Sequence, residues 1–115
     1  MRQTLATARS LTPLFTALAD PTRLRLLHLM AGREICVCYF AEVLGESQPK
    51  ISRHLAYLRR TGIAVARREG KWAHYRIQYP AHAGMAAILK QTLATLHKDP
   101  MMRMDLQRLR ERQGS

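Results

Sequence analysis

Residues 42–48 read EVLGESQ, and this short segment decides the fold. It contains the end of one helix at Leu44, a tight turn at Gly45 and, at Ser47, the cap of a second helix that has Pro49 in its first turn. Two helices joined in this way form a helix-turn-helix, whose second helix can lie in the major groove of DNA. The segment therefore predicts a DNA-binding fold.

The second helix is predicted over about Gln48 to Arg60. Its apolar residues Ile51, Leu55 and Leu58 recur at i, i+4 and i+7 and form the inward stripe. The early turns carry polar and basic side chains on the opposite face, and such side chains bind base edges or phosphates. We predict that the DNA contacts of this helix come from Ser47, Gln48, Lys50, Ser52, Arg53 and His54.

A second candidate DNA-binding element follows this helix. After Gly62 the polar–apolar period changes from about 3.6 residues to about 2, which is typical of strands. Residues 63–68 and 72–77 alternate on either side of a turn at Glu69-Gly70-Lys71, and they predict a β-hairpin. A helix-turn-helix followed by a two-stranded wing is a winged helix. The basic residues that we expect to grip DNA from this hairpin are Arg67, Arg68, Lys71 and Arg76.

The net charge of the chain is +11, from 19 Lys and Arg residues and 8 Asp and Glu residues, and it is unevenly distributed. Residues 50–76 hold eight basic residues and one acidic residue, a net charge of +7, whereas residues 20–49 have a net charge of −1. Such a block favours a polyanionic partner, either nucleic acid or an anionic membrane surface. Because these charges lie opposite a core stripe and on a hairpin, we expect double-stranded DNA and no membrane. A merely solvated charged face is the alternative.

The remaining helices are predicted from cap and proline signals. Thr12-Pro13 begins a first helix, Asp20-Pro21 begins a second, and residues 37–44 form a short third helix. After the hairpin, Pro80 opens a last long helix that Asp99-Pro100 stops. The predicted fold class is therefore mainly α with a β-hairpin, a winged helix-turn-helix of order α-α-α-α-β-β-α.

The length and composition predict one domain with a tail. A chain of 115 residues with 47% hydrophobic residues can build a core without disulfides. We place the winged-helix domain at residues 1–100. Residues 101–115 are charged and lack a clear period, so they form a C-terminal tail that is either a frayed helix or disordered. We expect Met101, Met102 and Met104 to pack loosely there rather than to bind metal.

Several classes of protein are disfavoured by the sequence. Uncharged apolar runs are far shorter than the roughly 18 residues of a membrane span, and residues 1–10 lack the apolar core of a signal peptide. Cys36 and Cys38 do not make a disulfide framework, which favours the reducing cytoplasm. A glycine-rich phosphate loop, a nucleophile elbow and a His-Glu-x-x-His motif are all missing, so we expect no enzyme.

Four segments together resemble the ArsR/SmtB family of bacterial metalloregulatory repressors. They read LADPTRLRLL at residues 18–27, CVC at 36–38, SQPKISRHL at 47–55 and EGKWAHYR at 69–76, and the resemblance covers about residues 11–98. It implies a homodimeric winged-helix repressor that binds its operator when ligand-free and leaves it on sensing a metal or metalloid. The domain would thus serve both DNA binding and dimerisation.

The resemblance also implies that the first and last helices make the dimer. This agrees with the apolar stripe of the last helix, which one small domain would not readily cover alone. The interface residues that we predict are Leu11, Leu14, Phe15, Met85, Leu89, Leu93 and Leu96.

The two cysteines are the candidate inducer site. Thiolates are soft ligands that suit Zn, Cd, Pb, Cu(I) and trivalent arsenic or antimony. The segment EICVC at residues 34–38 resembles the inducer site of the arsenic and antimony sensors of the family, so we predict As(III) or Sb(III) as inducer at Cys36 and Cys38, and no constitutive cofactor. Where those sensors commonly have a third cysteine this chain has Ala41, and Tyr39 stands where an aspartate is common. Water, a small thiol or an organic group of an organoarsenical would then fill the third position.

The spacing of the two cysteines suggests how ligation acts on the fold. If both lie in the third helix, their side chains point about 200° apart. One ion that binds both sulfurs at about 2.3 Å would then have to distort that helix. Because it is the first helix of the helix-turn-helix, ligation would shift the DNA-reading helix.

Other readings of the same residues remain open. The alternatives for the pair are a thiol-redox sensor, a site for Cd, Pb or Zn, and two small residues without function. A constitutive architectural DNA binder would have no inducer. His82 and His97 lack the partners of the zinc sensors, and we interpret them as ordinary surface histidines.

Overall fold

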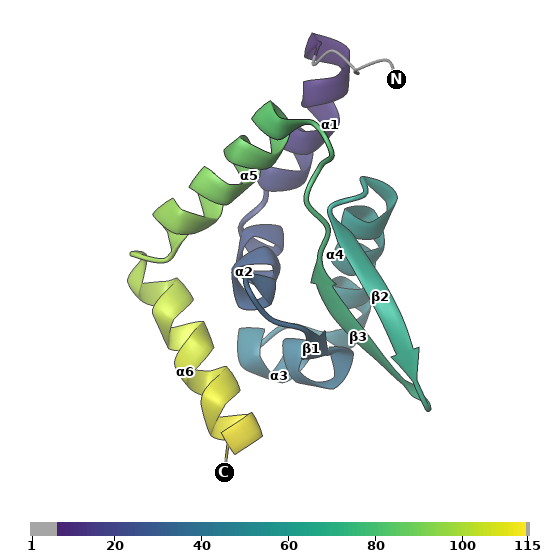
Figure 1. Ribbon diagram of the computed structural model, residues 1–115. Coiled ribbons are helices and arrows are strands. Elements are labelled where there is room, and N and C mark those ends of the chain that lie inside the picture. Colours follow the sequence, from purple (N-terminus) through teal and green to yellow (C-terminus); the bar gives the residue numbers. More distant parts are fainter. Residues whose placement is uncertain (1–6, 115) are drawn as a thin grey trace.

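The computed structural model describes residues 7–114 as a helical domain with one small sheet (Figure 1). The elements in chain order are α1 (Ala8–Leu18), α2 (Pro21–Met30), β1 (Ile35–Cys36), the 3₁₀ helix η1 (Val37–Tyr39), α3 (Phe40–Leu44), α4 (Gln48–Arg60), β2 (Ala64–Glu69), β3 (Trp72–Ile77), α5 (Ala83–Leu96) and α6 (Pro100–Gly114). Within the described residues, every helix is too short or too polar to cross a bilayer.

α2 lies at the centre of the fold and packs against α1, α3, α4, α5 and α6 (Figure 1). Its residues Leu26 and Leu27 are wholly buried. α4 covers one side of α2 with Ile51, Leu55 and Leu58, which are also buried. The predicted inward stripe of this helix is therefore confirmed, and burial of this stripe leaves the opposite face of α4 at the surface.

Two helix starts that were predicted from a cap followed by proline are confirmed. The Asp20 carboxylate accepts a hydrogen bond from the Arg23 backbone N–H at 3.0 Å, and α2 begins at Pro21. The Ser47 hydroxyl accepts from the Lys50 backbone N–H at 3.3 Å, and α4 follows. Each cap satisfies an N–H group that the first turn of a helix leaves without a partner.

α1 begins earlier than the sequence predicted. The Ser10 backbone N–H donates to the Thr7 hydroxyl at 3.2 Å, and the Thr7 backbone N–H donates to the Ser10 hydroxyl at 2.8 Å. This reciprocal capping box starts the helix at Ala8. Pro13, where the sequence predicts the start, lies inside the helix.

The predicted hairpin is confirmed, and a short strand extends it. The sheet has the order β1-β3-β2, and both pairings are antiparallel. Glu69 pairs with Trp72, so Gly70 and Lys71 form the turn. Gly70 has φ of 61°, a left-handed conformation that glycine adopts without steric cost.

The two faces of this sheet have different surroundings. Ile35 and Tyr75 are buried, and the Tyr75 ring meets Phe40 of α3 edge-on at 6.2 Å. Residues that pair across antiparallel strands share a face. Cys36 pairs with His74, and His74 pairs with Arg67, so these three residues lie side by side on the other face.

The C-terminal part of the chain differs from the prediction at the start of α5 and after its end. The helix starts at Ala83 rather than at Pro80, because the His82 ring caps it by accepting from the Gly84 backbone N–H at 3.1 Å. α5 ends at Leu96, just before the predicted stop at Asp99-Pro100, and this pair begins a further helix, α6, that was not predicted. The Asp99 carboxylate accepts from the Met101 backbone N–H at 2.8 Å, as Asp20 does for α2.

Residues 100–114 form a helix that packs on the domain, which differs from both predicted alternatives, a frayed helix and a disordered tail. Leu106 and Leu109 are buried, and Asp105 is fully buried in a bidentate pair with Arg25 at 2.9 and 2.8 Å. Arg112 of α6 also binds Glu42 of α3 at 2.8 Å. The helical domain thus continues past residue 100. Of the three tail methionines, Met102 is buried, whereas Met101 and Met104 are exposed.

Candidate DNA interface and inducer site

The N-terminal half of α4 presents polar side chains to solvent. Gln48, Ser52 and Arg53 are exposed, and so is the cap residue Ser47. α3 ends at Gly45, whose φ of 70° lets the chain turn sharply into α4. The first turn of α4 therefore offers these side chains to an anionic partner, but few backbone N–H groups, because Pro49 has none and Ser47 caps that of Lys50.

Two further residues predicted on this helix have partners within the chain. Lys50 Nζ lies 3.1 Å from Glu46 Oε1, an exposed pair that a phosphate can readily replace. His54 differs from the prediction, because its ring packs against the start of α2. Its Nδ1 lies 3.4 Å from Arg23 Nη1 and its Nε2 lies 3.9 Å from Asp20 Oδ1, and burial lowers the pKa of His54. The ring thus holds α4 against α2.

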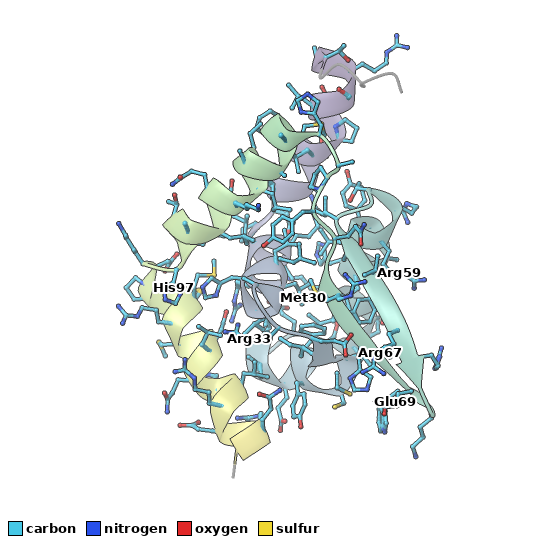
Figure 2. The ribbon with its side chains drawn as sticks, in the orientation of Figure 1. Met30, Arg33, Arg59, Arg67, Glu69 and His97 are labelled. Carbon is cyan, nitrogen blue, oxygen red and sulfur yellow. The ribbon has the colours of Figure 1, made fainter. Side chains whose placement is uncertain are left out.

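The wing carries basic residues of two kinds. Arg68 and Lys71 are exposed near the turn, where the Arg68 Nη1 donates to the Lys71 carbonyl at 3.3 Å. Arg67 is instead tied to Glu34, with its Nη2 2.6 Å and its Nε 3.1 Å from Glu34 Oε1. Figure 2 shows Arg67 and Glu69 on the hairpin; the Arg67 Nη1 is also 3.4 Å from Glu69 Oε1.

Glu34 was not predicted as a site residue, although it connects the wing to the cysteines. The hydrogen bonds from Arg67 lower the pKa of Glu34, and the charge of Arg76 adds to this effect. Arg76 is exposed on the same part of the sheet. Two of the four wing residues predicted to bind DNA therefore lie beside an acidic residue of the chain itself. Because this pairing spans 33 residues of sequence, no local pattern could reveal it.

The predicted helical setting of the cysteines is wrong. Cys36 is the last residue of β1 and is half-buried, and Cys38 is exposed within η1. α3 begins only at Phe40, because Cys36 is held in an extended conformation by pairing with His74. Cys36 Sγ accepts a hydrogen bond from the Cys38 backbone N–H at 3.3 Å. The argument that ligation must unwind a regular helix therefore does not apply.

The thiol of Cys38 is strongly disposed to keep its proton. Although Cys38 is largely exposed, the partial desolvation of its thiol and the neighbouring Cys36 raise the pKa of Cys38 to about 11. A thiol with this pKa is protonated at neutral pH, so the pair is not a preformed dithiolate.

Residues 34–39, which we call the inducer segment, touch both elements that the sequence predicts to bind DNA. Glu34 binds Arg67 of β2, and Cys36 pairs with His74 of β3. At its other end, the segment leads directly into α3, where Phe40 is wholly buried. His74, which also lies 3.4 Å from Glu69, was missed in the sequence, although the hairpin alternation places it on the same face as Arg67.

Comparison with known proteins identifies the family. Residues 20–65 match the model described as bacterial regulatory protein, arsR family. Over 79 residues the chain is 47% identical to the arsenical resistance operon repressor of Escherichia coli (strain K12), and this match covers 68% of each chain. The chain belongs to the ArsR family.

Solved structures agree with this assignment. HlyU from Vibrio cholerae N16961 matches with a TM-score of 0.69 and 25% identity, over 79% of this chain and 96% of that one. The AntR antimony-specific transcriptional repressor matches with a TM-score of 0.62 and 31% identity, over 84% of this chain and 87% of that one. This ArsR-family protein is thus a DNA-binding transcriptional repressor with a winged-helix fold rather than an enzyme, as the sequence predicted.

Homodimers are typical of the ArsR family, but the predicted interface residues divide into two groups. Leu14, Leu89 and Leu93 are buried in the core of the single chain, so they have little surface left for a partner. Phe15 is 50% exposed, and Leu11, Met85 and Leu96 are partly exposed. The sequence pattern could not separate the two groups, because both faces of these helices carry apolar residues.

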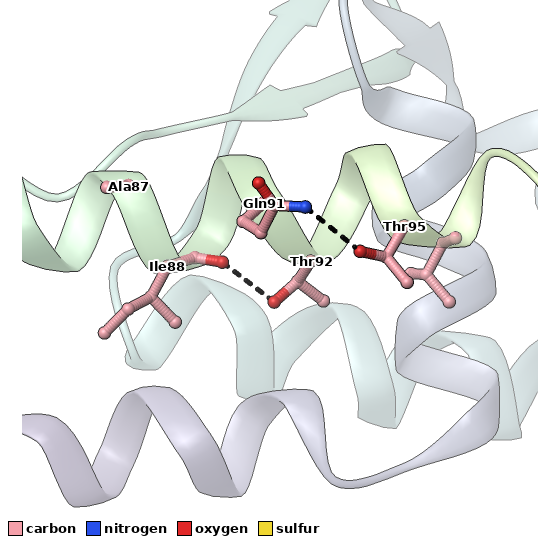
Figure 3. Close-up of a pocket in the computed structure, with 6 residues that line it drawn as sticks. Ala87, Ile88, Gln91, Thr92 and Thr95 are labelled. Atoms are coloured by element: carbon pink, nitrogen blue, oxygen red, sulfur yellow. Dashed lines mark hydrogen bonds between the residues drawn. The ribbon is translucent and has the colours of Figure 1, made fainter.

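An apolar groove runs along the outer face of α5. Figure 3 shows this helix with the Thr92 hydroxyl bonded to the Ile88 carbonyl at 2.8 Å and the Gln91 amide donating to the Thr95 hydroxyl at 3.3 Å. These bonds satisfy the polar groups within the helix itself. The residues that line the groove are Ala87, Ile88, Gln91, Thr92, Thr95 and Leu96.

The two histidines interpreted as surface residues have different settings. His82 caps α5, and the exposed His97 stacks on the buried His28 with ring centroids 5.4 Å apart. His97 is therefore more than a solvated side chain. Within residues 7–114, no three His, Cys, Asp or Glu residues come together as a metal site. Binding of an inducer at the cysteines would thus rest on two protein sulfurs.

Proposed function

We propose that this ArsR-family protein represses a metalloid-resistance operon and leaves its operator when As(III) or Sb(III) binds Cys36 and Cys38. The observation that carries the proposal is the position of the inducer segment, which pairs with the wing at one end and enters α3 at the other. The names of the Escherichia coli relative, an arsenical resistance operon repressor, and of AntR, an antimony-specific repressor, support the choice of inducer.

The DNA-binding part of the proposal rests on exposure. Gln48, Ser52 and Arg53 of α4 would read base edges, while Lys50, Arg68 and Lys71 would bind phosphates. Since many of these contacts are to phosphate, we expect the affinity to fall steeply with salt concentration. An affinity that is independent of salt would contradict this interface. Because the target is operator DNA, we place the protein in the cytoplasm.

The dimer would form through the outer face of α5 and the neighbouring α1. The groove along α5 and the exposed Phe15 are the apolar surfaces that such a partner would cover. Two copies related by a two-fold axis would present two α4 helices to successive major-groove faces. The operator is then expected to be two-fold symmetric.

Binding of As(III) by the two thiols needs no net release of protons. With As(OH)₃, two As–S bonds form and two As–O bonds break, and each thiol proton leaves on a hydroxyl as water. The high pKa of Cys38 therefore does not oppose the reaction, as it would for a divalent cation. Because Ala41 and Tyr39 supply no third thiol, the remaining position keeps its oxygen or takes a small thiol or an organic group.

Release of DNA would follow from where the two sulfurs are anchored. Ligation fixes Cys36 relative to Cys38 in place of the present N–H to Sγ bond of 3.3 Å. Cys36 is joined to β3, and Glu34 is joined to β2, so the wing moves with the segment. The metalloid then binds best to the conformation that binds DNA worst, and each ligand weakens the other.

Fluorescence anisotropy tests the proposal. The probe is a labelled palindromic duplex that the protein itself selects from a random library, titrated in turn with arsenite, antimonite, cadmium and hydrogen peroxide. We expect arsenite and antimonite to release the wild-type protein. Cys36→Ser and Cys38→Ser should bind the duplex as tightly but no longer respond. Gln78→Ala serves as a control, because this exposed residue belongs neither to the proposed DNA contacts nor to the cysteine site.

Each other outcome identifies an alternative. Release by peroxide with no response to arsenite would show a thiol-redox regulator. Release by cadmium alone would show a soft-metal sensor, and no response to any of them would show a constitutive DNA binder. An arsenite response that survives both cysteine substitutions would disprove the proposed site.

A further inference from the structure

A pocket between the end of α5 and α6 has a strongly positive lining. It encloses about 270 Å³ and is lined by His97, Arg103, Leu106, Gln107 and Arg110. None of these residues is acidic, and none belongs to α4, the wing or the inducer segment. The volume leaves room for a small ion together with part of its hydration shell.

The helical period of α6 builds one wall of the pocket. Arg103, Gln107 and Arg110 recur at i, i+4 and i+7, so they project from the same face of the helix. Leu106 is buried beneath them and holds this face against the domain. The guanidinium and amide groups therefore face one small space from a rigid element, and His97, the residue that follows α5, also lines this space.

The positive charges around the pocket are not compensated. Among the described residues, neither Arg103 nor Arg110 is within ion-pair distance of a carboxylate. Arg33 lies nearby, and its pKa is lowered by burial and then by the charge of Arg110. Figure 2 shows His97 at the corner between α5 and α6 and Arg33 further along beside α6.

The neighbouring acidic residues have other partners. Asp105 is held by Arg25 and Arg108, and Asp99 caps α6. Glu111 lies one turn beyond the pocket, where it accepts a hydrogen bond from Gln107 Nε2 at 3.3 Å. None of these carboxylates lines the pocket.

A buried histidine, His28, lies behind the pocket, and neighbouring positive charges act on its ring. His28 is 2% exposed, and its Nε2 lies 3.2 Å from His97 Nδ1, whereas its Nδ1 has no hydrogen-bond partner among the described residues. Burial and then the charges of His97 and Arg33 lower the pKa of His28. An anion in the pocket would offset this charge.

We propose that this pocket binds a small tetrahedral oxyanion of the phosphate, sulfate or arsenate type. Arg103 and Arg110 neutralise its charge and donate hydrogen bonds to its oxygens, and Gln107 and His97 complete the donor set. A free ion fits better than a DNA phosphate, because α6 and the hairpin lie on opposite sides of α2 (Figure 1). The site does not depend on the cysteines or on their inducer.

Titration of the full-length protein with inorganic phosphate at constant ionic strength tests this site, followed by ¹H–¹⁵N NMR. We expect saturable shifts at residues 97, 103, 107 and 110, with a midpoint on the order of 1 mM. Sulfate and arsenate should compete, and the shifts should persist when operator DNA saturates α4. Loss of the shifts on adding DNA would show that the ligand is a backbone phosphate, and the free-ion assignment would then be wrong.

Variants separate a specific site from general attraction to a basic protein. The double variant Arg103→Ala, Arg110→Ala should raise the midpoint at least about tenfold, and Gln107→Glu should weaken binding as well. The control Arg59→Ala, Arg60→Ala loses the same charge from the exposed end of α4 and should bind normally. Thermal unfolding without phosphate checks that each variant is folded. Equal weakening in the control, or shifts that never saturate, would show an adventitious ion only and would overturn the proposal.

Discussion

The inducer segment and the outer face of α4 differ in whether their charged groups are paired. The inducer segment leads into the helix-turn-helix, whereas α4 is its second helix. In the inducer segment, Glu34 is paired with Arg67 and the Cys38 thiol keeps its proton. On α4, Arg53 is exposed and has no ion-pair partner among residues 7–114. The first region is suited to rearrange without exposing charge, and the second to attract phosphate.

The largest effect that follows from this contrast concerns the pH dependence of inducer binding. Because the pKa of Cys38 is about 11, binding of Cd²⁺ by its thiolate at neutral pH must release the Cys38 proton, and this proton alone should make the affinity rise about tenfold per pH unit between pH 6 and 8. Condensation with As(OH)₃ returns the proton as water, so arsenite affinity should stay nearly constant. Isothermal titration calorimetry in buffers of different ionisation enthalpy measures both. A steep pH dependence for arsenite would show that the thiols are already ionised.

The next largest effect is expected for Arg53, the exposed arginine of α4. Arg53→Ala should cost about 2 kcal/mol of operator binding, roughly thirtyfold, because it lies in the turns that we propose enter the groove. Thermal stability should not change, since the side chain is exposed. Arg59→Ala is the matched control at the far end of α4, and anisotropy titration compares the two. Equal losses would mean that α4 contributes only general positive charge.

The fold was predictable where its signals are local. Asp20-Pro21 and Ser47 begin helices because a cap satisfies N–H groups within the next turn, whatever the rest of the chain does. The hairpin follows from alternation and from Gly70 in the same way. These elements carry most of the proposed DNA interface, so that interface was largely visible in the sequence.

The elements that were missed depend on distant partners. β1 has two residues and exists because Cys36 pairs with His74, so the cysteines could not be placed correctly from their own spacing. α6 does contain a buried stripe at Met102, Leu106 and Leu109, but the exposed methionines beside it obscured the period. The packing of His54 could not be predicted because its partners, Arg23 of α2 and the cap residue Asp20, are distant in sequence.

A smaller effect is expected for the free arginine of the wing. Arg68→Ala should weaken binding to all DNA sequences alike and reduce the slope of log affinity against log salt by about 1, because it removes one phosphate contact. Sequence preference should remain, since no base contact is lost. Anisotropy titrations of a specific and a scrambled duplex at several salt concentrations test this. A change in preference between the duplexes would place Arg68 on a base edge instead.

The smallest effect should come from Arg67, the neighbour of Arg68 that is tied to Glu34. Arg67→Ala should change DNA affinity less than Arg68→Ala, because its guanidinium already binds a carboxylate of the chain. Its main effect should be on the response to arsenite, because the Arg67→Ala variant lacks the ion pair with Glu34. The factor by which arsenite weakens DNA binding should fall by at most a few-fold, since an exposed ion pair contributes little energy. Glu34→Gln removes the other partner of this ion pair and should reduce the effect of arsenite on DNA binding in the same way. Arg67→Lys keeps the positive charge but not the bidentate geometry. If Arg67→Ala lowered DNA affinity as much as Arg68→Ala and left the arsenite factor intact, Arg67 would be an ordinary phosphate contact. Ligation in the inducer segment would then have to affect DNA binding through Cys38, η1 and the buried Phe40 of α3 alone.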